Sequence, residues 1–129
     1  MSKGRFIAGW ILSGLTGLLL LLDGVMKLFK PQFVVDANVG LGYPASVVVP
    51  LGVVLVLCTL LYLIPVTSIL GAILLTGYLG GAVATHVRVG GPAFPIIFAA
   101  TIGVLVWAGL YLRDPLISAV IPVRRSGEA

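Results

Sequence analysis

The chain has 129 residues, of which 60% are hydrophobic and only 9% are charged. A soluble domain carries about 25% charged residues, so this chain lacks the polar surface that a water-soluble fold needs. The net charge is +4, but the basic residues flank apolar segments, where they indicate membrane topology rather than nucleic-acid binding. The composition therefore predicts an integral membrane protein whose main partner is the lipid bilayer, with no nucleic acid.

Four apolar segments are long enough to cross a bilayer. No charged residue occurs from position 37 to position 87, a run of 51 residues. As one helix this run is roughly 75 Å long, against a hydrocarbon core of about 30 Å, so it must fold back into two spans. Spans are predicted at residues 6–28, 44–64, 67–87 and 92–112. The predicted fold class is all-α, an integral membrane four-helix bundle in which residues 1–129 form a single transmembrane domain.

The first span follows a short basic leader, which also fits a signal peptide. The apolar run is long for a signal peptide, however, and residues 23–27 (DGVMK) follow it instead of a small-residue cleavage site. We therefore expect a retained helix. Gly9, Ser13 and Gly17 lie four residues apart, and small residues at this spacing let another helix approach closely.

Residues 29–43 form the longest predicted connection, and two interpretations of this segment fit the sequence. It is either a solvated connector or a short interfacial helix that rests Phe33, Val34 and Leu41 on the bilayer. Long loops in compact folds are often functional, so the segment is also a candidate for a role in binding.

The third span carries small residues at helix-packing spacing. Gly77 and Gly81 lie at i and i+4, so we expect a neighbouring helix to pack against them. Inside an apolar span these glycines are not interpreted as a nucleotide-binding motif. The lone Cys58 of the second span is interpreted as a small buried apolar side chain.

An even number of spans places both termini on one side of the membrane. Five basic residues fall on that side: Lys3, Arg5, Arg113, Arg124 and Arg125. Three fall on the other side: Lys27, Lys30 and Arg88. The positive-inside rule then predicts a multi-pass protein of the cell (inner) membrane with both termini in the cytoplasm.

Four polar residues are predicted to share one membrane level near the outer surface. Asp23 lies inside the end of the first span, and Lys27 follows it by four residues on the same helix face. His86 and Arg88 end the third span, which finishes on the same side because spans alternate in direction. A carboxylate within a span costs about 2.5–3.5 kcal/mol at the centre and less near an end, so Asp23 should point into the bundle or toward Lys27.

Two interpretations of these four residues remain open. They form either a polar pocket that binds a small acidic ligand or a quinone, with His86 as a proton shuttle, or a ring of interfacial charges that are solvated separately. No spacing in the chain indicates a catalytic triad, so catalytic residues are unknown and the sequence does not decide whether the protein is an enzyme. One His and one Cys at different depths do not make a metal site.

Three segments together resemble the DoxX-like family of small membrane proteins. They are residues 23–28 (DGVMKL), 77–86 (GYLGGAVATH) and 107–115 (WAGLYLRDP), and the resemblance extends over about residues 5–125. It implies a four-helix membrane bundle, and it implies links to thiosulfate oxidation with a quinone acceptor and to membrane complexes that handle redox stress. The family supplies no settled catalytic residues to assign here.

Three functions fit the sequence. The first is a redox-associated or quinone-interacting membrane subunit that works with a membrane or redox partner protein, for which Asp23, His86 and Arg88 are the motive. The second is a non-catalytic membrane scaffold or assembly partner, favoured by the small-residue stripes and by the lack of evident cofactor ligands. The third is a small-molecule carrier, which four spans favour less. The oligomeric state is not indicated.

Overall fold

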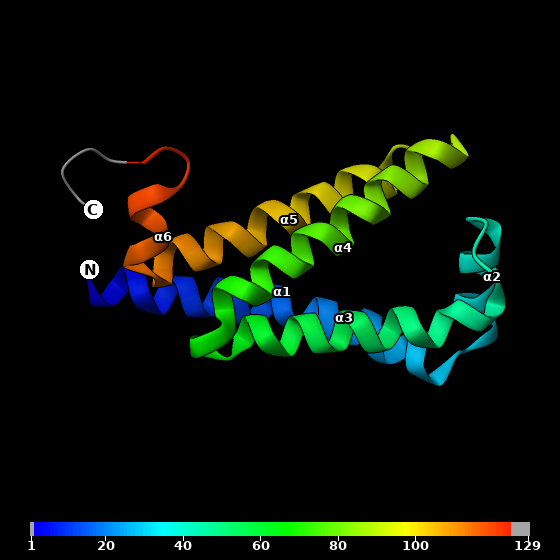
Figure 1. Cartoon of the computed structure of the whole chain (residues 1–129), viewed down its shortest axis with the longest axis horizontal. Helices are drawn as coiled ribbons and strands as arrows, with labels where there is room; N and C mark the ends of the chain where they lie inside the picture. Colours follow the sequence, from blue (N-terminus) through cyan, green and yellow to red (C-terminus); the bar gives the residue numbers. More distant parts are fainter. Residues whose placement is uncertain (1, 125–129) are drawn as a thin grey trace.

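The structure is a computed structural model that describes residues 2–124, and all regular secondary structure in that range is helical. Figure 1 shows the helices as long, roughly aligned rods with shorter pieces at both ends. The helical segments are α1 (Lys3–Phe29), α2 (Gln32–Gly40), η1 (Ala45–Val47), α3 (Val48–Leu63), η2 (Pro65–Thr67), α4 (Ser68–Val89), α5 (Phe94–Arg113) and α6 (Pro115–Val120).

Four of these segments are long and apolar enough to cross a membrane. They are α1, α3 with η1, α4 with η2, and α5. In lipid a helix satisfies its backbone hydrogen bonds internally, and these helices expose apolar side chains along their outer faces. Leu15, Leu57, Ile73 and Val104 are all about half exposed or more, as expected for a surface in contact with acyl chains. The predicted all-α bundle of four membrane-spanning helices is confirmed.

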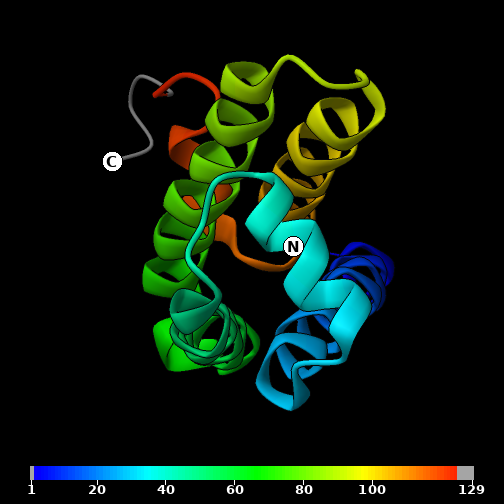
Figure 2. The same ribbon diagram turned by 90° about the vertical axis from the view of Figure 1, so that its right-hand side faces the viewer.

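The four spanning helices form a ring in which α1 and α4 each pack against both α3 and α5. Figure 1 shows two pairs, α1 with α3 and α4 with α5, which lie close at one end and diverge toward the other. Viewed from the divergent end in Figure 2, α2 crosses in front of the bundle. The chain thus has a closed end and an open end with a short helix across it.

The closed end is organised around Arg113, which is only 6% exposed. Its guanidinium donates from Nε to Ser13 Oγ at 2.9 Å, from Nη1 to Ser68 Oγ at 2.9 Å, and from Nη2 to the Tyr62 carbonyl at 2.9 Å. It also lies 4.1 Å from the centroid of the Trp10 ring. These contacts join all four spanning helices, and this part of the bundle is called the arginine end below.

The hydroxyl of Tyr62 extends the arginine network to the backbone of α5. It donates to the Val106 carbonyl at 2.6 Å and lies 3.0 Å from Ser13 Oγ. Because the single Tyr62 proton goes to the carbonyl, Ser13 donates to Tyr62 while it accepts from Arg113. Ser13 and Tyr62 are completely buried, so the network holds these polar groups in a dry interior at low cost.

Glycines permit the close approach at the arginine end. A Cβ atom at Gly9 would lie 2.7 Å from the Arg113 backbone nitrogen, and one at Gly109 would lie 2.5 Å from Ser13 Oγ. A Cβ atom at Gly71 would collide with the backbone of Tyr62. The predicted close packing along Gly9, Ser13 and Gly17 is confirmed, because Gly17 would likewise meet a neighbouring side chain.

The prediction that Gly77 and Gly81 are helix-packing contacts is wrong. A Cβ atom at either glycine would meet nothing within 4 Å in the described chain. Both residues lie on α4 where it diverges from α3, and both line an open cavity. Sequence spacing finds a small-residue stripe but does not show whether a helix or an empty space faces it.

The segment 29–43 contains a helix and is not a simple connector. Gln32–Gly40 folds as α2, ended by Gly42, whose positive φ of 98° suits glycine. The predicted short helix is therefore confirmed, and its place at the membrane interface stays a prediction; Phe33 is 64% exposed. Leu41 does not extend the exposed apolar face, because it lines the cavity at the open end.

Candidate functional site

A cavity of about 580 Å³ occupies the open end of the bundle, which is called the cavity end below. Its walls come from α1, α4 and α5 together with Leu51 of α3, and α2 with the segment after it contributes to its outer side. Most ligand sites of small molecules have volumes of this order, with mostly apolar walls and a few polar groups. The lining here has that composition, so the cavity is the candidate site.

Asp23 and Lys27 bring an ion pair to the wall that α1 provides. They lie four residues apart on α1, so their side chains meet on one face, and Lys27 Nζ lies 2.5 Å from Asp23 Oδ1. The side chain of Lys27 is 12% exposed and that of Asp23 is 53% exposed. The prediction that Asp23 points toward Lys27 is confirmed, and both residues line the cavity.

His86 and Tyr78 bring further polar groups to the cavity from α4. Each is half-buried, and neither side chain has a hydrogen-bond partner within residues 2–124. An imidazole and a phenol can both donate hydrogen bonds to a ligand oxygen. In the same part of the chain no three His, Cys, Asp or Glu side chains group together in a way that suits a metal ion.

Arg88 does not line the cavity, which corrects its predicted place beside the other three residues. Its Nη2 donates to the Leu41 carbonyl at 2.5 Å. This hydrogen bond fixes the segment after α2. A Cβ atom at Gly42 would lie 2.9 Å from the same nitrogen. Three of the four predicted pocket residues therefore share the cavity, and Arg88 fastens the chain at its rim.

Residues 41–43, called the strap below, are tied to α4 a second time through Tyr43. The Tyr43 hydroxyl lies 2.8 Å from Thr85 Oγ1, and both residues line the cavity. Asn38 of α2 also lines it and donates to the Val34 carbonyl at 2.8 Å. The sequence does not single out Tyr43, Tyr78 and Asn38, because nothing in their spacing shows that α2 lies across the open end.

Aromatic and aliphatic side chains of α5 and α1 form the apolar part of the cavity. The rings of Phe94 and Phe98 stack with centroids 5.8 Å apart at the start of α5. Leu19 and Leu20 of α1 and Ile102 of α5 also line the cavity, deeper than the ion pair. A ligand with one polar end and one flat apolar ring would meet suitable groups in both parts of this site.

A comparison with protein families identifies relatives of this chain. The model of the DoxX-like family matches residues 11–109, which includes the cavity residues of α1, α4 and α5. No curated protein and no solved structure matches the chain significantly.

Proposed function

Since the chain belongs to the DoxX-like family, we propose that it is a redox-associated membrane subunit whose cavity binds the head group of a quinone. The observation that carries the proposal is the cavity itself, about 580 Å³ between four membrane-spanning helices. It combines apolar walls with the Asp23–Lys27 pair, Tyr78 and His86. A membrane-soluble ligand with polar atoms on an apolar body suits such a lining.

The polar groups have separate roles in this proposal. His86 and Tyr78 donate hydrogen bonds to the quinone oxygens, because neither has a partner in the described chain. Lys27 places a positive charge in the cavity, held by Asp23, which stabilises the extra negative charge of a reduced head group. The electrons come from a membrane or redox partner protein, so this chain binds and orients the quinone.

The test is binding of ubiquinone-1 to the purified protein in lipid nanodiscs. We expect saturable binding that weakens about tenfold in His86→Ala, the size expected when a hydrogen bond in a dry site is lost. Gln32→Ala is the matched control, because Gln32 pairs with Asp36 on α2 outside the cavity. Equal affinity in the wild type, His86→Ala and Tyr78→Phe would show that the cavity does not bind the quinone.

The scaffold alternative makes a different prediction about which molecules co-purify with the protein. After mild extraction, a co-purifying quinone detected by mass spectrometry supports the redox role. A stoichiometric partner protein with no quinone supports a scaffold that assembles other subunits. The same preparation thus separates the two functions without any assumption about a reaction.

We also propose that both termini lie in the cytoplasm and that the cavity opens toward the outer side of the cell membrane. The start of α1 and the end of α5 lie together, since Arg5 donates to the Tyr111 carbonyl at 3.0 Å. The five basic residues of this side outnumber the three of the other side. A single cysteine at Ser2 in a Cys58→Ala background should react with a membrane-impermeant maleimide only after the cells are opened.

A further inference from the structure

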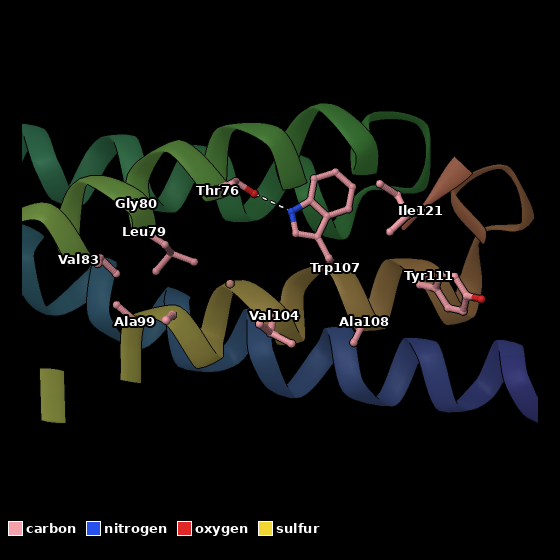
Figure 3. A pocket seen from close by; sticks show the side chains of 12 residues that line it. Thr76, Leu79, Gly80, Val83, Ala99, Val104, Trp107, Ala108, Tyr111 and Ile121 are labelled. Carbon is pink, nitrogen blue, oxygen red and sulfur yellow. Dashed lines mark hydrogen bonds between the residues drawn. The ribbon is translucent and has the colours of Figure 1, made fainter. Parts of the chain in front are cut away.

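A second hollow lies on the outside of the bundle, between α4 and α5. It is a groove of about 600 Å³ whose walls are almost entirely apolar. Figure 3 shows it running along the two helices from Val83 and Ala99 toward Tyr111 and Ile121. Two polar groups in its wall bond each other: the Trp107 indole nitrogen donates to Thr76 Oγ1 at 2.7 Å.

The groove and the cavity meet at two residues. Leu79 and Ala99 line both hollows and are the thin wall between them. Both side chains are buried, with 8% of Leu79 and 7% of Ala99 exposed, so they close the wall in this structure. A Cβ atom at Gly80 would meet nothing within 4 Å, and one at Gly103 would meet only Leu79 Cδ1, at 3.9 Å.

Leu79 is the larger of the two side chains that separate the polar cavity from the lipid-facing groove. Figure 3 shows it directed from α4 into the space beside α5. A leucine side chain can adopt more than one staggered rotamer, and Gly103, which lies beside Leu79 Cδ1, adds no side chain to its surroundings. A hydrocarbon tail that passes from the cavity to the groove has to displace the Leu79 side chain.

We infer that the groove holds the hydrocarbon tail of the molecule whose head group lies in the cavity, so that the ligand is a long-tailed quinone. This inference rests on the proposed function and extends it from the head group to the whole ligand. From Ala99 to Tyr111 the groove follows twelve residues of helix, or about 18 Å. A tail must be longer than one isoprene unit to occupy that length.

The tail makes specific contacts in the groove that fluid lipid does not offer. It gains little from the hydrophobic effect, because lipid is already apolar, so the gain comes from close dispersion contacts with fixed walls. The effect on affinity is therefore modest, and it depends on the shape of the groove. A new side chain that fills the groove removes this gain in affinity.

The test compares ubiquinone-1 with ubiquinone-4 in lipid nanodiscs, with each affinity expressed per lipid molecule so that partition into the bilayer cancels. We expect the long-tailed quinone to bind about tenfold more tightly, a modest gain from dispersion contacts. Gly80→Leu should remove this advantage and leave the affinity for ubiquinone-1 unchanged. Gly14→Leu is the matched control, because Gly14 is exposed on α1 and its Cβ would also meet nothing within 4 Å.

A second variant, Ala100→Leu, fills the groove from α5 and should give the same result, which covers a failure of Gly80→Leu to fold. Equal affinities of the two quinones in the wild type, or an advantage that survives in both variants, would overturn the inference and leave the proposed function standing. If the tail instead leaves the cavity between α1 and α5, the advantage of the long-tailed quinone survives in both variants. If ubiquinone-1 itself does not bind, the proposed function fails and this inference fails with it.

Discussion

The two ends of the bundle are built from the same kinds of side chain and use them in opposite ways. At the arginine end, Arg113, Ser13 and Tyr62 satisfy one another in a dry interior. At the cavity end, Tyr78 and His86 face a hollow with no partner in the described chain. A polar group that a protein partners internally stabilises the fold, whereas one that it leaves open to a cavity is available to a ligand.

The glycines of α4 face different surroundings at the two ends of the bundle. At the arginine end Gly9, Gly71 and Gly109 face another helix closely, so the helices touch. At the cavity end the α4 glycines Gly77 and Gly81 face empty space. At that same end Gly24 and Gly52 still bring α1 and α3 into close contact. The contrast therefore lies along α4, where Gly71 packs against α3 and Gly77 and Gly81 do not, and substitutions at these positions should have unequal effects.

The largest expected effect is that of Arg113→Ala. It removes three hydrogen bonds that join α1, α3 and α4 to α5 and leaves buried serine hydroxyls without a donor. We expect the free energy of unfolding, measured by titration with SDS in mixed micelles, to fall by about 3 kcal/mol.

Lys3→Ala is the control for this change, because Lys3 is an exposed basic residue in the first turn of α1. A surface substitution of this kind changes stability by about 0.5 kcal/mol or less. Similar losses for the two variants would mean that the arginine end does not hold the bundle together.

A comparison of Gly71→Ala with Gly77→Ala tests the glycine argument on a single helix. The new Cβ at Gly71 would lie 2.7 Å from the Leu61 carbonyl carbon and nearer still to Tyr62, a distance that backbone cannot tolerate without moving. Overpacking of this kind costs about 1–3 kcal/mol, so the melting temperature in detergent should fall. Gly77→Ala should be neutral or slightly stabilising, since alanine is the better helix former; a loss equal to that of Gly71→Ala would restore the rejected packing role.

Much of the fold could be predicted from the sequence, because span lengths and the absence of charge determine it. The Asp23–Lys27 pair could also be predicted, because a spacing of four residues on a helix brings two side chains together. His86 could be assigned to their level because spans alternate in direction. These inferences use only distances along a helix.

The rest depends on how the helices are rotated and tilted against one another, which the sequence does not state. Arg113 ends its span as an ordinary topology-setting residue does, yet it is buried between four helices. Arg88 has the same appearance in the sequence but lies at the rim and holds the strap. The difference comes from Ser13 and Ser68, small polar residues that meet Arg113 only after the bundle has assembled.

A smaller effect is expected from removing one hydroxyl at each end. Tyr62→Phe takes away the donor to the Val106 carbonyl in the buried network, which should cost about 1 kcal/mol in the free energy of unfolding. Tyr43→Phe removes a contact with Thr85 that is only partly buried, and water can replace it. We expect a smaller loss there, and a larger loss for Tyr43→Phe than for Tyr62→Phe would reverse the assignment of the two ends.

The smallest effect on overall stability is expected at the strap, where Arg88→Ala removes a single hydrogen bond to the Leu41 carbonyl. Because this bond fastens α2 across the cavity end, its loss should appear as local opening and not as global unfolding. Amide hydrogen exchange of α2 should accelerate about tenfold, as expected for one charge-assisted bond, while exchange in the core of α5 stays unchanged.

Gly42→Ala should have the same effect by a different route, since its φ of 98° disfavours a side chain and a Cβ there would meet Arg88 Nη2. With Lys3→Ala as the unaffected control, unchanged α2 exchange in both variants would show that the strap does not hold α2 over the cavity.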